Sequence, residues 1–550
     1  MNTIIDRLRD RAGNEGERTA LIWLDEADAE RRVSYDELER WARSIAVGLL
    51  ERFEPGQRLI LIYPPGIEII AALLGCFYAG IVAVPIYPPS PMAVERSKKI
   101  FAGIVQTAQP SGILCDPIAL PFQAMFGGEA PALPWVPTPA AIPSPPPVAP
   151  PKPEQTAFLQ FTSGSTAAPK GVIVTLGMLS ANQEIMTHHL PLERRAMGAS
   201  WLPMYHDMGL IGSVFHPVYR GFGVVLLSPL SFIRRPVRWL RAISRYGVAI
   251  SGAPNFAYEL CAKRVTEEES AGLDLSSWTV AFCGAEPIAR ASLEAFATRF
   301  APNGFKESSF YPCYGLAEAT LMVTCRQGVH GHRLATSSED ATAGEFVSCG
   351  KPAPGTDVRI VDPATSRALE EERVGEVWIR GPSVTTGYFM DPEATAALAG
   401  HVDGEAAQAP FLRTGDLGYV HDGELYLVGR LKDIIIVQGT NYYPAEIEWA
   451  VRKVDPKLIH DVAAVPAKRE GSEALALIVE LASGVRTDTV PREQLEAAVQ
   501  ACCRQLVGLQ PEVTLVRYRA LPRTTSGKLQ RSRAARMLAD GELGPGGSGG

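Results

Sequence analysis

A loop rich in hydroxyl residues and glycine, at residues 161–171, constrains this chain most. Apolar runs at 157–159 and 172–174 flank it, and the loop ends in Lys170. Two strands joined by such a loop can offer backbone N–H groups, hydroxyls and one ammonium to a polyphosphate. Pro169 stands where the Walker P-loop needs glycine, so this is a different loop. A plain Ser/Gly hairpin with an incidental lysine is the alternative at this point.

Size and composition indicate a soluble globular protein with more than one domain. The chain has 550 residues, too many for a single core. Hydrophobic residues make up 46% and charged residues 21%. The net charge of −7 gives no global basic field that would attract nucleic acid.

Cysteine usage and the N-terminus predict a cytoplasmic protein. The nine cysteines are scattered apart from Cys502 and Cys503, and no Cys-x-x-Cys or zinc spacing occurs. We expect reduced, mostly buried thiols. The N-terminus lacks a signal-peptide pattern. The most apolar stretch, 66–84, is short and contains Glu68, which favours a buried helix leading into a core strand over a lipid-spanning helix.

Strand and helix patterns alternate in the first part of the chain. Residues 33–50 have helical spacing, 58–63 read as a strand, 73–79 as a helix and 81–86 as the next strand. This alternation predicts an α/β fold with parallel sheets covered by helices. The proline-dense segment 131–153 predicts an extended surface connection within one domain.

A second, smaller domain is predicted after a charged turn at 429–433. We expect a large N-terminal domain at 1–430, a small α+β domain at 431–540 and a flexible glycine-rich tail at 541–550. The elements expected around and after the turn are strands at 423–428, 434–437, 462–465 and 475–481 and helices at 444–454 and 492–506.

Five separated motifs together resemble one superfamily. They are 162–171, Tyr314-Gly-Leu-Ala-Glu-Ala-Thr320, Thr414-Gly-Asp416, Gly429-Arg-Leu-Lys-Asp433 and Pro522-Arg-Thr-Thr-Ser-Gly-Lys528. Their order and residue types resemble the adenylate-forming enzymes: acyl-CoA synthetases, peptide-synthetase adenylation domains and luciferases. The match runs to about residue 537.

Within that superfamily the chain is similar to fatty acyl-AMP ligases. The finer resemblance lies in Val84-Pro-Ile-Tyr-Pro-Pro89, 201–212, 253–258, 284–287, 347–350 and 439–444. One departure is Ala167, where the family usually has glycine, and this costs the loop some backbone freedom.

The resemblance implies ATP and Mg²⁺ as cofactors and names the charged residues that would handle them. Lys170 would meet the β- and γ-phosphates, and Lys528 would reach the bond between the substrate carboxylate and the α-phosphate. Glu318 would bind Mg²⁺, with the hydroxyl of Thr162 or Thr166 nearby. The alternatives are a solvated Lys528 and a Glu318 that caps a helix.

The resemblance also implies the nucleotide and acyl sites. Tyr314 would offer its ring to adenine, or be a core tyrosine. Asp416 would hold the ribose hydroxyls with help from Arg430. The implied ATP- and AMP-binding residues are Thr162, Ser163, Gly164, Ser165, Thr166, Gly284, Ala285, Glu286, Tyr314, Gly315, Leu316, Asp416 and Arg430.

The acyl side would lie at 206–211. No second His or Cys stands at ligand spacing from His206, so metal binding there is not expected. His206, Met208, Gly209 and Ile211 would contact the acyl substrate, or else be a structural histidine and ordinary core. Lys432 would be the hinge between the two domains.

The implied reaction is adenylation of a fatty acid with release of pyrophosphate. The acyl group would then pass to the phosphopantetheine thiol of a holo-acyl carrier protein, or of a carrier domain in a polyketide or peptide synthase. The segment 327–346 is either the family's insertion that restrains the small domain and excludes CoA, or a plain surface loop. Alternatives for the whole chain are an acyl-CoA synthetase, an amino-acid-activating domain and a catalytically silent scaffold.

Overall fold

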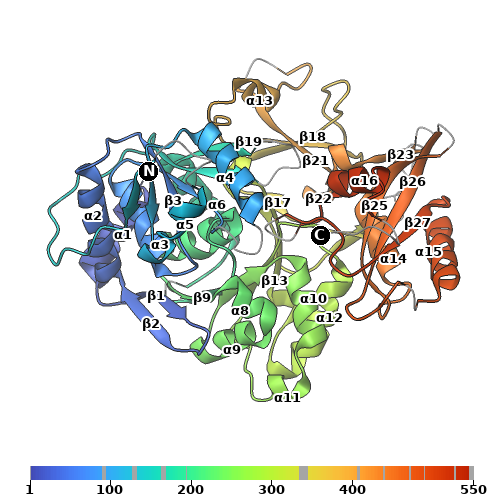
Figure 1. Ribbon diagram of the computed structural model, residues 1–550, viewed down its shortest axis with the longest axis horizontal. Helices are drawn as coiled ribbons and strands as arrows, with labels where there is room; N and C mark the ends of the chain where they lie inside the picture. The colour runs from blue at the N-terminus through green and yellow to red at the C-terminus, as the bar shows by residue number, and fades with distance from the viewer. Residues whose placement is uncertain are drawn as a thin grey trace.

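The structure is a computed structural model of the chain. It describes residues 2–88, 94–126, 133–162, 169–193, 195–333, 345–405, 409–437, 440–469, 472–487, 490–524 and 528–543. A large body spans the blue to yellow part of the chain, and a smaller unit at its C-terminal end carries the elements drawn in orange-red (Figure 1).

The first sheet has six strands in the order β6-β5-β3-β4-β7-β8. All neighbouring pairs are parallel except β7 and β8, which form an antiparallel hairpin. The strands are β3 (Arg58–Ile62), β4 (Val82–Pro85), β5 (Gly112–Cys115), β6 (Trp135–Pro137), β7 (Thr156–Thr162) and β8 (Lys170–Thr175).

The second sheet has nine strands in the order β17-β14-β13-β12-β11-β9-β10-β1-β2. Its centre, from β13 to β1, is parallel, and its two margins are antiparallel. The strands are β1 (Thr19–Leu24), β2 (Glu30–Ser34), β9 (Met197–Ser200), β10 (Gly223–Leu226), β11 (Ile250–Ala253), β12 (Val280–Cys283), β13 (Phe310–Gly315), β14 (Met322–Cys325) and β17 (Lys351–Pro352).

Helices cover both sheets because their apolar faces have no other partner. Helix α2 begins with a capping box between Ser34 and Glu37 and buries Leu38, Ala42 and Ile45 against α3. The helices of the large body are α1 (Ile4–Glu15), α2 (Tyr35–Leu50), α3 (Ile67–Tyr78), α4 (Val94–Ala108), α5 (Phe122–Phe126), α6 (Leu176–His189), α7 (His216–Arg220), α8 (Pro229–Arg234), α9 (Val237–Tyr246), α10 (Asn255–Arg264), α11 (Glu267–Ser270) and α12 (Arg290–Phe300).

Short helical turns complete the large body. The 3₁₀ turns are η1 (Pro117–Ala119), η3 (Ala301–Asn303), η4 (Glu307–Ser309), η5 (Ala317–Ala319) and η6 (Leu431–Asp433), and η2 (Met208–Phe215) is a π-helix.

A third, antiparallel sheet connects the large body to the small unit. Its order is β18-β19-β21-β20, with β22 also paired to β21. Beside it lies the hairpin of β15 (Gly331–Arg333) and β16 (Glu345–Val347). The other elements are β18 (Asp357–Val361), β19 (Gly375–Arg380), α13 (Pro392–Ala397), β20 (Ala399–Gly400), β21 (Phe411–His421) and β22 (Glu424–Arg430).

The small unit is α+β and has apolar clusters of its own. Its three-stranded sheet has the order β25-β26-β27, with helices α14, α15 and α16 packed around it (Figure 1). The elements are β23 (Ile435–Val437), β24 (Thr440–Tyr442), α14 (Pro444–Arg452), β25 (Ile459–Arg469), β26 (Ser472–Leu481), α15 (Arg492–Val507), β27 (Glu512–Val516) and α16 (Arg531–Ala539).

The predicted α/β fold class is confirmed, but several helices and strands begin or end at residues other than those predicted. The helix expected at 73–79 is the longer α3, which starts at Ile67 and is almost wholly buried, as expected for this apolar stretch. All nine cysteines are free, and seven are buried. Within the described ranges, no helix combines the length and apolarity needed to cross a membrane. The tail beyond Leu543 lies outside the described residues.

Candidate active site

A cavity of about 1950 Å³ lies where the carboxyl ends of the parallel strands converge. Residues just past β3, β4 and β5 line it from the first sheet, and residues just past β9, β10, β11, β12 and β13 line it from the second. Ligands of open α/β sheets bind at this edge, because side chains on the connecting loops converge there. Lys528 from the small unit also lines this cavity.

The two strands that flank the predicted phosphate loop reach this cavity, where Phe161 and Lys170 line it. Thr162 ends β7 and Lys170 begins β8, and the two residues are direct partners in the antiparallel hairpin. Lys170 lines the cavity, with its ammonium nitrogen 4.9 Å from the ring centroid of Tyr388. Ser163, Gly164, Ser165, Thr166 and Ala167 lie outside the described residues.

Tyr388 links Lys170 to Glu318. The Tyr388 hydroxyl donates to Glu318 Oε1 at 2.7 Å. Burial, together with the neighbouring Glu318 carboxylate, raises the pKa of Tyr388, so this hydroxyl stays a donor. The sequence analysis did not single out Tyr388, and its only signal was an aromatic residue after glycine in a polar stretch.

Backbone bonds hold Tyr388 in place. Phe389 N–H donates to Gly171 O, and Ile173 N–H donates to Gly387 O, so this segment runs along β8. Thr385 N–H donates to Glu318 O at 2.8 Å and ties the same segment to η5. The phosphate-loop lysine and the Glu318 carboxylate are therefore fixed relative to one another.

A buried asparagine supports the Glu318 turn from the other side. The Asn182 amide on α6 donates to Ala319 O at 3.2 Å and to Met322 O at 2.9 Å, and its oxygen accepts from Met322 N–H. The Glu318 carboxylate lines the cavity and is only partly exposed. A carboxylate is the hard oxygen donor that Mg²⁺ prefers, so Glu318 fits the predicted metal role.

Changing Tyr388 to phenylalanine should lower activity with ATP and Mg²⁺ but keep the aromatic ring beside Lys170. The lost hydrogen bond to a charged group is worth about 1.5–3 kcal/mol. We expect kcat/KM for ATP to fall roughly tenfold, and the Mg²⁺ concentration for half-maximal rate to rise. A Mg²⁺ titration of Tyr388→Phe beside Tyr388→Ala measures this. A loss in Tyr388→Ala with none in Tyr388→Phe would mean that the ring, and not the hydroxyl, carries the effect.

Tyr314, Asp416 and Arg430 form a second charged group. Asp416 accepts from the Tyr314 hydroxyl and from Arg430 Nε, each at 2.8 Å. Asp416 and Arg430 are cross-strand partners on β21 and β22, while Tyr314 comes from β13. Burial and the adjacent Asp416 raise the pKa of Tyr314. The structure thus brings together three predicted nucleotide residues that lie far apart in the sequence.

Part of the predicted segment 284–286 lines the same cavity as Tyr314. Ala285 and Glu286 face the cavity, and Ala285 has φ +66°. Gly284 lies behind them, because a Cβ there would approach Cys313 O and Sγ at 2.8 Å. Glu286 Oε1 accepts from Phe256 N–H at 2.7 Å, and burial raises the pKa of Glu286. The predicted Gly315 and Leu316 also line the cavity.

Lys528 projects from the small unit toward the large body. Its backbone pairs with Thr524, and residues 525–527 lie outside the described residues. Burial opposes ionisation of Asp207, but the adjacent His206 and then Lys528 outweigh it and lower the pKa of Asp207 to about 2. The charge of Lys528 also favours a lower pKa for Glu286, although burial of Glu286 has the larger effect and raises it. Its ammonium therefore lies within electrostatic reach of both carboxylates.

The predicted acyl residues separate into two sets. His206 and Met208 line the cavity, and His206 Nδ1 lies 2.7 Å from Asp207 Oδ1. Ile211 is fully buried in the core, and a Cβ on Gly209 would meet Pro203 O at 2.1 Å, so neither of these two reaches the cavity. They belong to the π-helix η2, which the sequence analysis did not predict.

Aromatic side chains that the sequence analysis did not assign line the rest of the cavity. Trp201 stacks on Phe232 with centroids 3.8 Å apart, and Tyr87 packs edge-on against Tyr205 at 4.9 Å. Gln160 Nε2 donates to Tyr205 O at 2.8 Å and fixes this corner. The apolar wall residues near them include Leu230, Ile233, Phe256 and Leu260.

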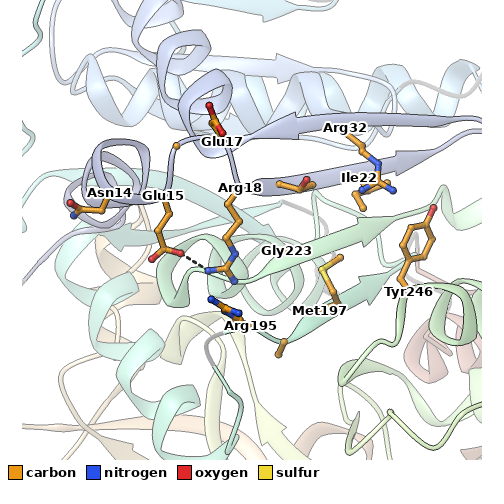
Figure 2. A pocket seen from close by; sticks show the side chains of 13 residues that line it. Asn14, Glu15, Glu17, Arg18, Ile22, Arg32, Arg195, Met197, Gly223 and Tyr246 are labelled. Carbon is orange, nitrogen blue, oxygen red and sulfur yellow. Dashed lines mark hydrogen bonds and ion pairs between the residues drawn. The ribbon is translucent and has the colours of Figure 1, made fainter.

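A second hollow, of about 760 Å³, lies at the amino-terminal ends of β1, β9 and β10, near the end of α1 (Figure 2). Two of its cationic side chains already face carboxylates: Arg18 bonds Glu15 at 2.5 Å, as drawn, and Arg32 bonds Glu30. None of the described residues predicted for the site lines it. We therefore assign the active site to the larger cavity.

Comparison with known families agrees with this assignment. The family of AMP-binding enzymes matches residues 8–389, and the AMP-binding enzyme C-terminal domain matches residues 439–536. The chain is 36% identical to the medium-chain-fatty-acid–[acyl-carrier-protein] ligase JamA of Moorena producens, over 98% of this chain and 96% of the relative. It is 32% identical to the long-chain-fatty-acid–AMP ligase FadD23 of Mycobacterium tuberculosis, over 96% and 94%.

Solved structures of relatives have the same architecture. A structure from a study of fatty acyl-adenylate ligases of E. coli and L. pneumophila superposes with a TM-score of 0.89 at 33% identity, over 98% of both chains. A fatty acyl-adenylate ligase of L. pneumophila with acyl adenylate and pyrophosphate gives a TM-score of 0.74 at 34% identity, over 98% and 96%. The chain belongs to the AMP-binding enzyme family and, within it, to the fatty acyl-AMP ligases.

Proposed function

We propose that the protein activates a fatty acid with ATP and transfers the acyl group to a carrier-bound phosphopantetheine thiol. One observation carries this proposal. A single cavity brings together the phosphate-loop lysine Lys170, the carboxylate Glu318, the Asp416–Arg430 pair and Lys528 from the small unit. These are the groups that adenylation of a carboxylate needs, because both reactants are anions.

The nucleotide would lie along the carboxyl edge of the second sheet. Asp416 would accept from ribose hydroxyls while Arg430 and Tyr314 hold its carboxylate in place. Ala285, Glu286 and Tyr314, which line the cavity, would form the wall beside adenine. Lys170 and the hydroxyl-rich loop would hold the β- and γ-phosphates. Glu318 would hold Mg²⁺, which neutralises phosphate charge when bound.

In the first half-reaction, a carboxylate oxygen of the fatty acid forms a bond to the α-phosphorus. The bond from that phosphorus to the bridging oxygen breaks, and pyrophosphate leaves. Lys528 would stabilise the charge that builds between the carboxylate and the α-phosphate. In the second half-reaction, the thiol bonds to the carbonyl carbon, the bond to the AMP oxygen breaks, and the thiol proton passes to solvent.

The walls of the cavity favour an acyl chain over an amino acid. Apolar and aromatic side chains form the wall beyond His206. The acidic residues there are already paired: Asp207 with His206, Glu259 with Lys263 at 2.5 Å, and Glu286 with Phe256 N–H. An amino-acid substrate would need a carboxylate for its ammonium, and these three are engaged.

The thiol that accepts the acyl group distinguishes a carrier-protein ligase from an acyl-CoA synthetase. Free CoA carries a phosphorylated nucleotide that needs an open path, whereas a carrier protein brings its own docking surface. Phe346 on β16 lines the cavity and packs in one apolar cluster with Tyr443 of the small unit. Residues 334–344 of the predicted insertion lie outside the described residues.

We expect acyl-AMP to accumulate when CoA is the only thiol offered, and to be consumed when a holo-carrier protein is added. Mass spectrometry of acyl-AMP, acyl-CoA and acyl-carrier, with the apo-carrier as control, measures this. Efficient turnover to acyl-CoA at ordinary CoA concentrations would overturn the carrier proposal and favour the acyl-CoA synthetase.

Replacing Lys432 with proline should slow thiol transfer more than adenylation. Lys432 lies in η6, between β22 and β23, where a hinge must change φ and ψ. Proline fixes φ at a cost of about 3 kcal/mol where another value is needed.

We therefore expect Lys432→Pro to slow thiol transfer roughly 100-fold more than adenylation. Single-turnover assays of each half-reaction measure the two rates. Lys432→Ala, which keeps the backbone free, is the matched control. If proline slows both half-reactions equally, residue 432 is not the hinge.

A further inference from the structure

Two histidines and a glutamate meet beside the third sheet, away from the active-site cavity. His332 lies on β15, His421 ends β21, and Glu372 precedes β19; one ligand atom from each lies within 4.8 Å of the other two. We propose that these three side chains bind one divalent transition-metal ion of the Zn²⁺ class, which fastens the β15–β16 hairpin to the third sheet.

The distances from the Glu372 carboxylate to the two histidines lie on either side of the spacing between zinc ligands. Glu372 Oε1 lies 2.7 Å from His421 Nδ1 and 3.7 Å from His332 Nε2. Zinc binds nitrogen and oxygen ligands at about 2.0–2.2 Å in a tetrahedron, which sets neighbouring ligand atoms about 3.3–3.5 Å apart. The imidazole rings are stacked with centroids 3.8 Å apart, so binding would turn the His421 ring toward the ion while the Tyr419 hydroxyl holds the His332 ring.

His332 has a hydrogen-bond partner on its other ring nitrogen, and His421 has a carboxylate nearby on the same side. His332 Nδ1 lies 3.1 Å from the hydroxyl of the buried Tyr419, and His421 Nε2 lies 3.6 Å from Asp422 Oδ2. Metal-binding histidines almost always have such an outer partner, which fixes the tautomer and the ring orientation. The Tyr419 contact leaves His332 Nε2 facing Glu372, and His421 Nδ1 faces the same carboxylate.

The cluster is anchored and accessible. Glu372 N–H donates to Val420 O at 2.9 Å, which holds the glutamate beside β21. The side chains of His332, Glu372 and His421 are 20%, 46% and 29% exposed. An ion can therefore enter from solvent, and water can complete the coordination as in open zinc sites.

The position of the cluster gives the ion a structural role. His332 belongs to the hairpin, whereas Glu372 and His421 belong to the third sheet. Phe346, on the second strand of the hairpin, packs with Tyr419 and with Tyr443 of the small unit. A bound ion would hold the base of the segment that the sequence analysis links to acceptor choice, a consequence that depends on the proposed function.

The test is direct metal binding by the full chain, without nucleotide or substrate. After chelator treatment and desalting, isothermal titration with Zn²⁺ should give one site per chain. His332→Ala and His421→Ala should each weaken it roughly 100-fold, the upper range for disturbing a ligand shell. His401→Ala, an exposed histidine at the opposite end of β21, should bind like the unchanged chain.

An absorption spectrum with Co²⁺ tests whether cysteine thiolates are ligands. With Co²⁺ in place of Zn²⁺, ligation by histidine and glutamate gives only visible d–d bands, whereas a thiolate adds a strong near-ultraviolet charge-transfer band. Glu372→Gln tests the site should a histidine variant fail to fold. Hydrogen exchange of 331–333 and 345–347 should slow on adding Zn²⁺. Absence of stoichiometric binding, binding unchanged in these variants, or a thiolate band would each overturn the proposal.

Discussion

Replacing Lys528 with alanine is expected to lower the rate of acyl-AMP formation by roughly 100-fold or more, the scale for losing one preorganised electrostatic group. The substrate carboxylate and the α-phosphate repel each other as they approach. Lys528 is the cation from the small unit whose charge already reaches Asp207 and Glu286 on the cavity wall. Fatty-acid-dependent release of pyrophosphate measures the rate.

A matched control separates this effect from loss of a surface charge. Lys457 is an exposed lysine of the same small unit, and Lys457→Ala should leave adenylation unchanged. Transfer from preformed acyl-AMP should suffer less in Lys528→Ala, because no α-phosphate attack occurs in that step. Near-normal acyl-AMP formation by Lys528→Ala would remove Lys528 from the reaction.

Replacing Glu318 with glutamine is expected to cost roughly 100-fold or more in adenylation, since metal stabilisation of phosphate charge is worth several kcal/mol. Glutamine keeps an oxygen that can accept from Tyr388 but loses the negative charge. The variant should need more Mg²⁺ for half-maximal rate, and excess Mg²⁺ should restore part of the activity. A Mg²⁺ titration with saturating ATP measures this.

The contrast with Tyr388→Phe makes the Glu318 prediction specific. The phenylalanine variant keeps the carboxylate and loses only its hydrogen-bond donor, so its loss should be about tenfold. A Glu318→Gln enzyme with unchanged Mg²⁺ dependence would show that the carboxylate has only a structural role at its turn.

The architecture was predictable because it rests on local patterns. The apolar runs near 58–63 and 81–86, separated by a helical stretch, could only form parallel strands with a crossover helix. That arrangement alone places the residues after β3 and β4 at one edge of the sheet, where the cavity lies. The small unit was predictable for the same reason.

The contacts within the site were not predictable from patterns. Asp416 and Tyr314 are 102 residues apart, and only the resemblance to a family joined them. Tyr388 carried only a weak sequence signal, because its role comes from pairing of its segment with β8. Met208 and Ile211 look alike in sequence, yet the π-helix directs only Met208 to the cavity. Long-range packing decides such contacts.

The most direct test of the central claim follows the carboxylate oxygens of the substrate. A fatty acid labelled with oxygen-18 in both carboxylate positions is incubated with the enzyme, ATP and a holo-carrier protein, and all products are weighed by mass spectrometry. Attack on the α-phosphate predicts one labelled oxygen in AMP, unlabelled pyrophosphate and an acylated carrier. Label in inorganic phosphate together with ADP, or no product that depends on the fatty acid, would contradict the account.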